Sequence, residues 1–180
     1  TTKFNVLELG ENNGYFDLGQ EIGKLAYNLT NYSIGAYYRI DESYDQLTSN
    51  GNFLFTLSNT QNAMNDQSGY IIGSLKDQSL SISPQYYTSA SGNQAVSVAS
   101  PALKGSWHHF FYVQNGTQGT VYIDGTPFQT SDITNLPAST LQRTGRLGTI
   151  YNWIGRSNYT GDVYLRKTKV YDFRLYNRAL

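Results

Sequence analysis

Acidic side chains are the first candidates for chemistry in this sequence, and their spacing argues against hydrolysis. The four glutamates are Glu8, Glu11, Glu21 and Glu42, and none has an aspartate two places later. That spacing matters because residues two apart on a strand face the same groove, where paired carboxylates can cleave a glycosidic bond. The nearest acidic pair is Glu42 and Asp45, in a segment predicted to be a polar loop. We therefore expect no catalysis.

The two histidines, His108 and His109, are adjacent in a segment predicted to be a strand. Neighbouring strand residues point to opposite faces, so these imidazoles cannot chelate one ion without a bulge. We expect one ring to pack beside the core and the other to form hydrogen bonds. The sequence shows no Ser/His/Asp order, no phosphate-binding loop and no zinc-ligand spacing.

Aromatic residues give the remaining functional signal, with 16 Tyr, eight Phe and two Trp. Tyr and Trp suit sugars, because a ring stacks on the C–H face while its polar tip meets the hydroxyls. Residues out of phase with the apolar positions are candidates for exposure, and nearby Arg and Asn side chains are candidate hydrogen-bonding partners. The aromatic candidates are Tyr37, Tyr122, Tyr151, Trp153 and Tyr159, and the polar candidates are Arg39, Asn152, Arg156 and Asn158. The alternative is that strand propensity alone enriches Tyr and Trp and that these rings only pack.

Trp153 is the candidate with the sharpest prediction. Alternation through residues 150–155 places Tyr151 and Trp153 on one face, opposite Ile154. If Ile154 faces the core, Trp153 turns outward, and we expect an exposed stacking platform beside Tyr151. The same phase turns the polar Asn152 toward the core, and a bulge there would reverse the assignment.

Composition limits the kinds of partner. A chain of 180 residues with 39% apolar residues is expected to form one domain, residues 1–180, which we take to be cut from a longer secreted protein. The 13 basic and 13 acidic residues cancel, so neither nucleic acid nor an anionic membrane is expected as a partner. No apolar run reaches membrane-spanning length. The absence of Cys favours a bacterial source over a disulfide-rich animal one.

Short alternating segments separated by Gly, Asn and Ser run through the whole chain. Residues 107–113 and 120–123 read as a hairpin, with Phe110 and Tyr112 on one face and His109 and Phe111 on the other. Residues 32–40 alternate in the same way, with Tyr37 and Arg39 opposite the apolar set. Further strands are expected at 4–9, 15–18, 53–58, 70–75, 80–83 (ended by Pro84), 96–99, 150–155, 163–166 and 170–176, a short helical turn within 19–31, and loop at 131–148. This pattern predicts an all-β fold, a two-sheet antiparallel jelly-roll sandwich with little or no helix.

Several motifs resemble the laminin-G-like (LamG) branch of the concanavalin A-like lectin/glucanase superfamily. They are Trp107-His108-His109, Val121-Tyr122-Ile123-Asp124-Gly125, Trp153-Ile154-Gly155-Arg156-Ser157, and the opening and closing strands near residues 7–18 and 170–180. About eight residues between Gly161 and Val170 are inserted relative to the family pattern. The Glu-x-Asp-x-x-Glu strand of the catalytic glucanases is missing. The resemblance implies a concanavalin A-like sandwich, and it makes Asp17 and Asp162 candidate ligands for calcium, Ca²⁺, although each also suits an Asx turn.

These observations favour a non-catalytic module, extracellular, on the cell surface or periplasmic, that binds a glycan or polysaccharide or accompanies a glycan-processing enzyme. The alternative is a protein–protein adhesion domain of LamG type, and a glycoside hydrolase is the third possibility. Neighbouring domains of a longer chain are also expected partners. An exposed aromatic in a groove with adjacent amides would favour the glycan, whereas a flat apolar patch would favour adhesion.

Overall fold

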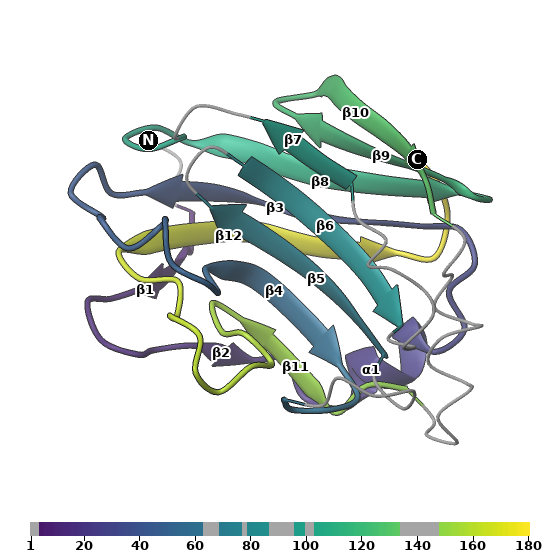
Figure 1. Ribbon diagram of the computed structural model, residues 1–180, viewed down its shortest axis with the longest axis horizontal. Coiled ribbons are helices and arrows are strands. Elements are labelled where there is room, and N and C mark those ends of the chain that lie inside the picture. The colour runs from purple at the N-terminus through teal and green to yellow at the C-terminus, as the bar shows by residue number, and fades with distance from the viewer. Residues whose placement is uncertain (1–3, 63–68, 77–78, 87–95, 100–102, 134–147) are drawn as a thin grey trace.

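The computed structural model describes residues 4–62, 69–76, 79–86, 96–99, 103–133 and 148–180, and these form two six-stranded antiparallel sheets packed face to face (Figure 1). We call the sheet nearer the viewer in Figure 1 the front sheet, with strand order β2-β11-β4-β5-β6-β7. The back sheet has the order β1-β12-β3-β8-β9-β10. The expected all-β, two-sheet jelly-roll sandwich is therefore confirmed.

The strands are short and come from all parts of the chain. The front sheet contains β2 (Phe16–Asp17), β11 (Tyr151–Ile154), β4 (Phe53–Ser58), β5 (Gly69–Lys76), β6 (Ser79–Tyr86) and β7 (Val96–Ala99). The back sheet contains β1 (Leu7–Leu9), β12 (Thr168–Tyr176), β3 (Tyr32–Ile40), β8 (His108–Asn115), β9 (Gln118–Ile123) and β10 (Thr126–Asp132). One helix, α1 (Glu21–Ala26), lies within the segment where a helical turn was expected.

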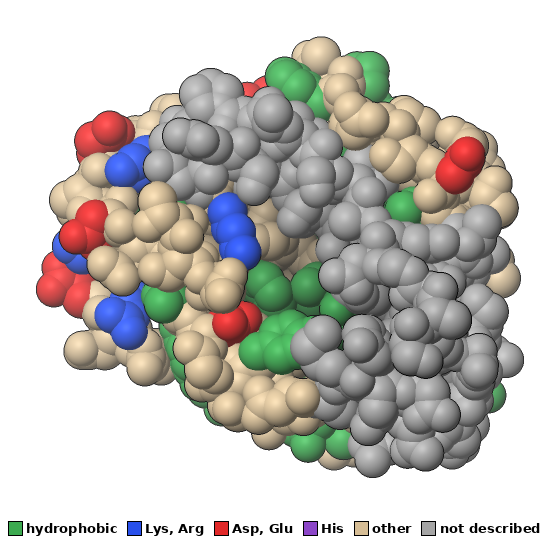
Figure 2. All heavy atoms as spheres, in the orientation of Figure 1, with side chains coloured by type: hydrophobic (Ala, Val, Ile, Leu, Met, Phe, Trp, Pro, Cys, Tyr) green, Lys and Arg blue, Asp and Glu red, His purple; other side chains and the backbone are tan. Residues whose placement is uncertain are grey.

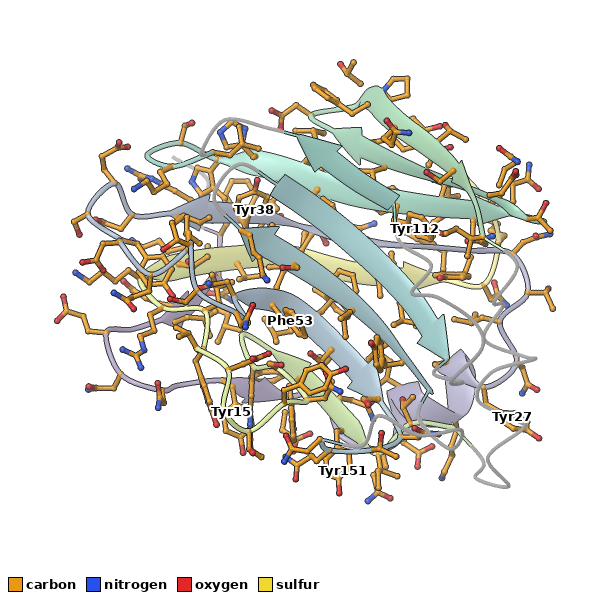
Figure 3. All side chains as sticks on the ribbon, viewed as in Figure 1. Tyr15, Tyr27, Tyr38, Phe53, Tyr112 and Tyr151 are labelled. Carbon is orange, nitrogen blue, oxygen red and sulfur yellow. The ribbon has the colours of Figure 1, made fainter. Side chains whose placement is uncertain are left out.

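Alternation correctly predicted the faces of the back sheet. Phe110 and Tyr112 of β8 are fully buried against the front sheet, with Ile34 and Tyr38 of β3 beside them. Leu54, Phe55, Leu57 and Ile71 meet them from the front sheet, so the core lies between the two layers. Tyr38 and Tyr112 reach into this space from the back sheet (Figure 3). Burial on this scale is the main stabilising term for a chain without disulfides.

Two sequence expectations about elements are wrong. The first concerns strand β6, which does not end at Pro84 but continues to Tyr86. It stays paired with β5 up to Tyr86, whereas its described pairing with β7 stops at Ile82, so Pro84 has no described β7 partner that would need its N–H. Asp124 and Gly125 end β9, as the turn signal indicated. Both have positive φ, 53° and 78°, and form a tight hairpin turn into the exposed strand β10, which the sequence did not predict.

The second error concerns residues 163–166, which form no strand and make a single parallel bridge, Val163 to Gly51. The backbone hydrogen bonds of Val163 and Leu165 go to Asn50, Asn52 and Gly155, which lie outside the strands. The loop expected at 131–148 begins later than expected, since β10 runs to Asp132, and residues 134–147 lie outside the described part of the chain.

Candidate functional site

Trp153 faces away from the sandwich core, as expected, but the expected exposure is wrong. Its strand neighbour Ile154 belongs to the core, and Trp153 pairs with Thr56 of β4 on the outer face of the front sheet. The ring is nevertheless only 5% exposed. It is covered because Tyr15 packs edge-on at 5.6 Å, Tyr151 lies at 5.4 Å, and the Arg156 guanidinium carbon sits 4.0 Å from the ring centre. Trp153 is thus the floor of a cluster and not its exposed surface.

Arg156 lies at the centre of this cluster. Its guanidinium carbon is 4.6 Å from the Tyr15 ring centre and 5.5 Å from that of Tyr164, in addition to the Trp153 contact. Aromatic faces attract cations because their quadrupole is negative there. We call Tyr15, Tyr151, Trp153, Arg156 and Tyr164 the Trp153 cluster. Tyr15 is 42% exposed, and Tyr151, Arg156 and Tyr164 are half-buried, so the cluster has a solvent-facing rim.

The sequence predicted Tyr151, Trp153 and Arg156 but missed Tyr15 and Tyr164. Tyr15 precedes β2, which pairs with β11 through Asp17 and Trp153, and this register brings Tyr15 beside the indole. Tyr15 and Tyr151 lie at the same lower margin of the front sheet (Figure 3). No local pattern could place Tyr164, because its segment forms no regular strand.

Backbone contacts hold the cluster in place. The Thr56 hydroxyl donates to the Arg156 carbonyl at 2.8 Å, and the Gly155 and Leu165 N–H groups bond across to Leu54 and Gly155. Asn152, whose inward orientation could have required a bulge, instead lies fully buried with its amide satisfied by Gly19 and Thr149. The Trp153 orientation therefore needs no bulge in β11.

Asn158 and Tyr159 belong to a neighbouring loop and not to the Trp153 cluster. Asn158, a candidate hydrogen-bonding partner for a ligand, is fully buried, and neither of its amide atoms has a hydrogen-bond partner. Its position is fixed by the backbone, since the Asn62 N–H donates to the Asn158 carbonyl. The Tyr159 hydroxyl donates to that of Tyr70 at 3.2 Å, and this ring covers a small apolar cluster of Phe53, Tyr70 and Ile72. Both residues therefore pack the loop over the front sheet.

The remaining candidates, Tyr37, Arg39 and Tyr122, lie on the outer face of the back sheet, opposite the Trp153 cluster. Tyr37 is 39% exposed and stacks on His109 at 4.2 Å, and His109 stacks on Phe111 at 5.2 Å. Tyr122 pairs with Phe111 on the same face and is half-buried. Arg39 is exposed and lines a charged cleft of about 270 Å³ that also contains Glu8, Glu11, Lys167 and Lys169.

A shallow cavity of about 400 Å³ lies beside Tyr37, and all its lining residues are apolar or aromatic. We call them the back-sheet patch: Phe4, Val6, Tyr37, Trp107 and Tyr171. Phe4, Val6, Tyr37 and Trp107 are all exposed, and Phe4 packs edge-on against Tyr171 at 5.3 Å. The structure therefore divides the predicted aromatic surface into two groups on opposite faces.

Asp17 and Asp162, the two candidate calcium ligands, lie on separate segments, and each accepts a hydrogen bond from its own segment. Asp17 is on β2, where it pairs with Trp153, and its Oδ1 accepts the Gly19 N–H at 2.8 Å. Asp162 lies against Gly51, beyond the start of β4, and its Oδ2 accepts the Ser157 hydroxyl. Calcium ligands must all reach within about 2.6 Å of the ion. In the described part of the chain, no three His, Cys, Asp or Glu side chains gather into a possible metal site. The calcium site stays a prediction.

A serine–histidine–aspartate relay, which the sequence did not predict, lies on the back sheet. The Ser106 hydroxyl is 2.9 Å from His108 Nε2, and His108 Nδ1 is 2.8 Å from Asp124 Oδ2. Asp124 Oδ1 also accepts the His109 N–H at 2.7 Å. The pKa of Asp124 is lowered: burial raises it, but the hydrogen bonds from His108 and His109 outweigh that effect. The two histidines thus divide as expected, one hydrogen-bonded and one packed in an aromatic stack.

The comparisons with known proteins agree with this architecture. The model of the family Laminin_G_3, described as concanavalin A-like lectin/glucanases superfamily, matches residues 10–180. The chain therefore belongs to this family, a LamG-type branch of the concanavalin A-like fold. No curated protein sequence is similar enough to match the chain.

Solved structures share the fold at low identity. A Ruminococcus gnavus IT-sialidase CBM40 bound to alpha2,3 sialyllactose is 12% identical with a TM-score of 0.70, covering 97% of this chain and 91% of that one. Mouse laminin alpha1 LG4-5 is 16% identical with a TM-score of 0.62, covering 98% and 44%. A Trypanosoma rangeli sialidase is 20% identical with a TM-score of 0.56, covering 98% of this chain but 26% of that one. Among the described helices, none has the length and apolar character needed to cross a membrane.

Proposed function

We propose that this domain is a non-catalytic, secreted or surface-exposed module that binds glycans through the rim of the Trp153 cluster. The observation that carries this proposal is the position of Tyr15 and Tyr151. Both are solvent-accessible rings fixed against the buried Trp153, with the Arg156 guanidinium between the aromatic faces. Rings that are already packed lose little entropy when a sugar stacks on them.

The surroundings of the cluster support the same function. Hydrophobic side chains lie in the middle of the front-sheet face, next to polar and charged ones (Figure 2). Thr56 and Ser58 of β4 pair with Trp153 and Tyr151, and their buried hydroxyls donate to the Arg156 and Thr60 carbonyls, so the backbone under the rings is held in place. The Ruminococcus gnavus CBM40, a module of this fold, holds alpha2,3 sialyllactose in its solved structure, which adds weight to a glycan as ligand.

The arrangement of the acidic residues supports the absence of catalysis. Glu8 and Glu11 line the charged cleft of the back sheet, and their carboxylates lie 3.9 Å from Lys169 and 3.7 Å from Lys167. A glycosidase needs two carboxyl groups on either side of the bound sugar, and these two glutamates are instead placed beside lysines. Neither glutamate adjoins the Trp153 cluster.

A glycan array tests the proposal. Tyr15→Ala and Tyr151→Ala should each weaken binding about tenfold, which corresponds to roughly 1.4 kcal/mol of lost stacking. Tyr122→Ala, on the opposite sheet, is the matched control and should bind like the wild type. If binding is lost in Tyr122→Ala but kept in both front-sheet variants, the glycan site lies on the back sheet and the proposal is wrong.

The back-sheet patch favours a second candidate function, contact with another protein. Its lining is apolar and exposed, whereas the Trp153 cluster carries a charge. Contiguous exposed apolar surface of this kind marks protein interfaces. Trp107→Ser should then abolish capture of a protein ligand from the native environment without altering the glycan array. If it changes neither readout, the patch has no such partner.

A further inference from the structure

We propose that the sugar bound at the Trp153 cluster is anionic and that Arg156 recognises its negative group. This inference rests on the proposed glycan-binding function and names the ligand class. It begins with an unbalanced charge. Arg156 is half-buried among Tyr15, Trp153 and Tyr164, and no described carboxylate lies within salt-bridge distance of it.

The guanidinium also keeps its hydrogen-bonding capacity. It has five N–H donors, and none is bonded to a described protein group. The only polar bond of this residue to β4 uses its backbone carbonyl, which accepts from Thr56. By contrast, the Arg174 guanidinium donates hydrogen bonds to Asp172 and Tyr176, and the Arg166 guanidinium donates to Asn13. Arg156 is therefore positioned by its backbone and aromatic contacts, with its donors available to a ligand.

The aromatic surroundings make a charged partner the better match. Rings exclude water from the guanidinium without neutralising it, and an ion pair is stronger where the local dielectric is low. A carboxylate or sulfate can accept two parallel N–H bonds from the planar fork, whereas a neutral hydroxyl accepts weaker ones. The exposed Tyr15 and Tyr151 rings would stack on the sugar that carries this group.

The position of Asp17 allows a test of whether the ligand carries a negative charge. It is exposed and pairs with Trp153 across β2 and β11, so its carboxylate is on the same face as the cluster. It makes no ion pair with Arg156, and one of its oxygens is held by the Gly19 N–H. This carboxylate repels an anionic ligand. Removing its charge should therefore tighten binding to an anionic sugar.

The test is an array that carries neutral, carboxylated and sulfated forms of the same glycans, probed with the wild type and four variants. The strongest wild-type signals should come from anionic forms. Arg156→Gln should weaken these anionic signals at least about tenfold, since a charge-assisted pair is lost. The binding of Arg156→Lys should lie between that of the wild type and that of Arg156→Gln, because lysine keeps the positive charge but lacks the planar guanidinium. Asp17→Asn should strengthen them several-fold, and raising the salt concentration should weaken them. Arg39→Gln, an exposed arginine of the back sheet, should have no effect.

The best-bound glycan is then tested after carboxyl reduction and after desulfation, and the treatment that removes binding identifies the anionic group that Arg156 binds. Melting temperatures show whether Arg156→Gln is folded. If Arg156→Gln does not fold, the array binding of Arg156→Lys and Asp17→Asn still tests the proposal. Equal binding of neutral and anionic forms, or weaker anionic binding by Asp17→Asn, would overturn this inference. If that neutral binding still depends on Tyr15 and Tyr151, glycan recognition at the cluster stands. A blank array would overturn both proposals.

Discussion

The Asn152 side chain donates a 2.8 Å hydrogen bond to the backbone carbonyl of Gly19, joining β11 to the segment between β2 and α1. Its Nδ2 also donates to the Thr149 carbonyl at 3.1 Å, and its Oδ1 accepts the Thr149 hydroxyl. Asn152 thus satisfies three groups in a site without solvent. This explains how a polar residue can occupy the inward position next to Trp153.

Asn152→Ala should lower the free energy of unfolding by about 3 kcal/mol, because several buried polar groups lose their partner at once. Urea denaturation measures the change. The matched control is Asn158→Ala, which also removes a fully buried amide, but one whose atoms have no hydrogen-bond partner. Asn158→Ala should cost clearly less. Equal losses would show that packing volume, and not hydrogen bonding, determines the cost.

The stability of the back sheet should depend on pH through His109. Burial against Tyr37 and Phe111 lowers the pKa of His109, although the carboxylates of Asp124 and Asp172 act in the other direction. A histidine with a lowered pKa takes up its proton less readily in the folded state than in the unfolded chain, where its pKa is about 6.5. Stability from this group is therefore complete above about pH 6.5 and declines as the pH falls below that value.

His109→Phe keeps the aromatic stack and the backbone N–H that bonds to Asp124 but removes the titration. The variant should show a smaller fall in melting temperature than the wild type between pH 7 and pH 5. Asp124, whose pKa is also lowered, should add its own loss at more acidic pH in both proteins, because a depressed carboxyl pKa stabilises only while the group is ionised. Identical melting curves across pH 5–7 would contradict the role given to His109.

The difference between what the sequence predicted and what it missed has a physical explanation. Alternation is a local property, so it correctly assigned the faces of Tyr37, Phe110 and Ile154. Exposure of an outward residue depends on what else covers that face. Trp153 is buried by Tyr15, which precedes β2, and by Arg156, which follows β11. These contacts depend on strand order, which alternation does not encode.

The relay of Ser106, His108 and Asp124 was missed for the same reason. Its histidine and aspartate are 16 residues apart in sequence and meet only because β8 and β9 form a hairpin. Strand β10 was missed because its exposed polar residues lack an apolar face. Long-range pairing decides both features, and a local pattern cannot supply it.

Calcium provides a third test. Asp17 pairs with Trp153 from β2, whereas Asp162 lies against Gly51, so the two candidate ligands belong to different segments. We expect at most one of them to ligate Ca²⁺, so any rise in melting temperature on adding Ca²⁺ should be lost in at most one of Asp17→Asn and Asp162→Asn. Differential scanning fluorimetry with and without EDTA measures it, with Mg²⁺ as the control ion. Loss of the calcium response in both single variants would show that both carboxylates contribute to one site.

The last prediction is that the Ser106–His108–Asp124 relay is structural and performs no acyl transfer. Its distances of 2.9 Å and 2.8 Å match those of a hydrolase triad. Such a triad also needs free N–H donors beside the nucleophile for the oxyanion. The Gly105 N–H instead donates to Ile40, and the Asp124 N–H donates to His109. Ser106 also lines neither the back-sheet cavity nor the charged cleft, so no substrate pocket adjoins its hydroxyl there.

The relay's role is to fasten the start of β8 to the turn after β9. Asp124→Ala should therefore lower the free energy of unfolding by about 1–2 kcal/mol, since the His109 N–H and His108 Nδ1 lose their acceptor. Ser106→Ala, which removes one exposed contact, should change it much less. A fluorophosphonate probe should fail to label the wild type, and p-nitrophenyl acetate hydrolysis should be the same in Ser106→Ala. Labelling of Ser106 that disappears in His108→Gln would show instead that the relay activates the serine and that the domain is an enzyme.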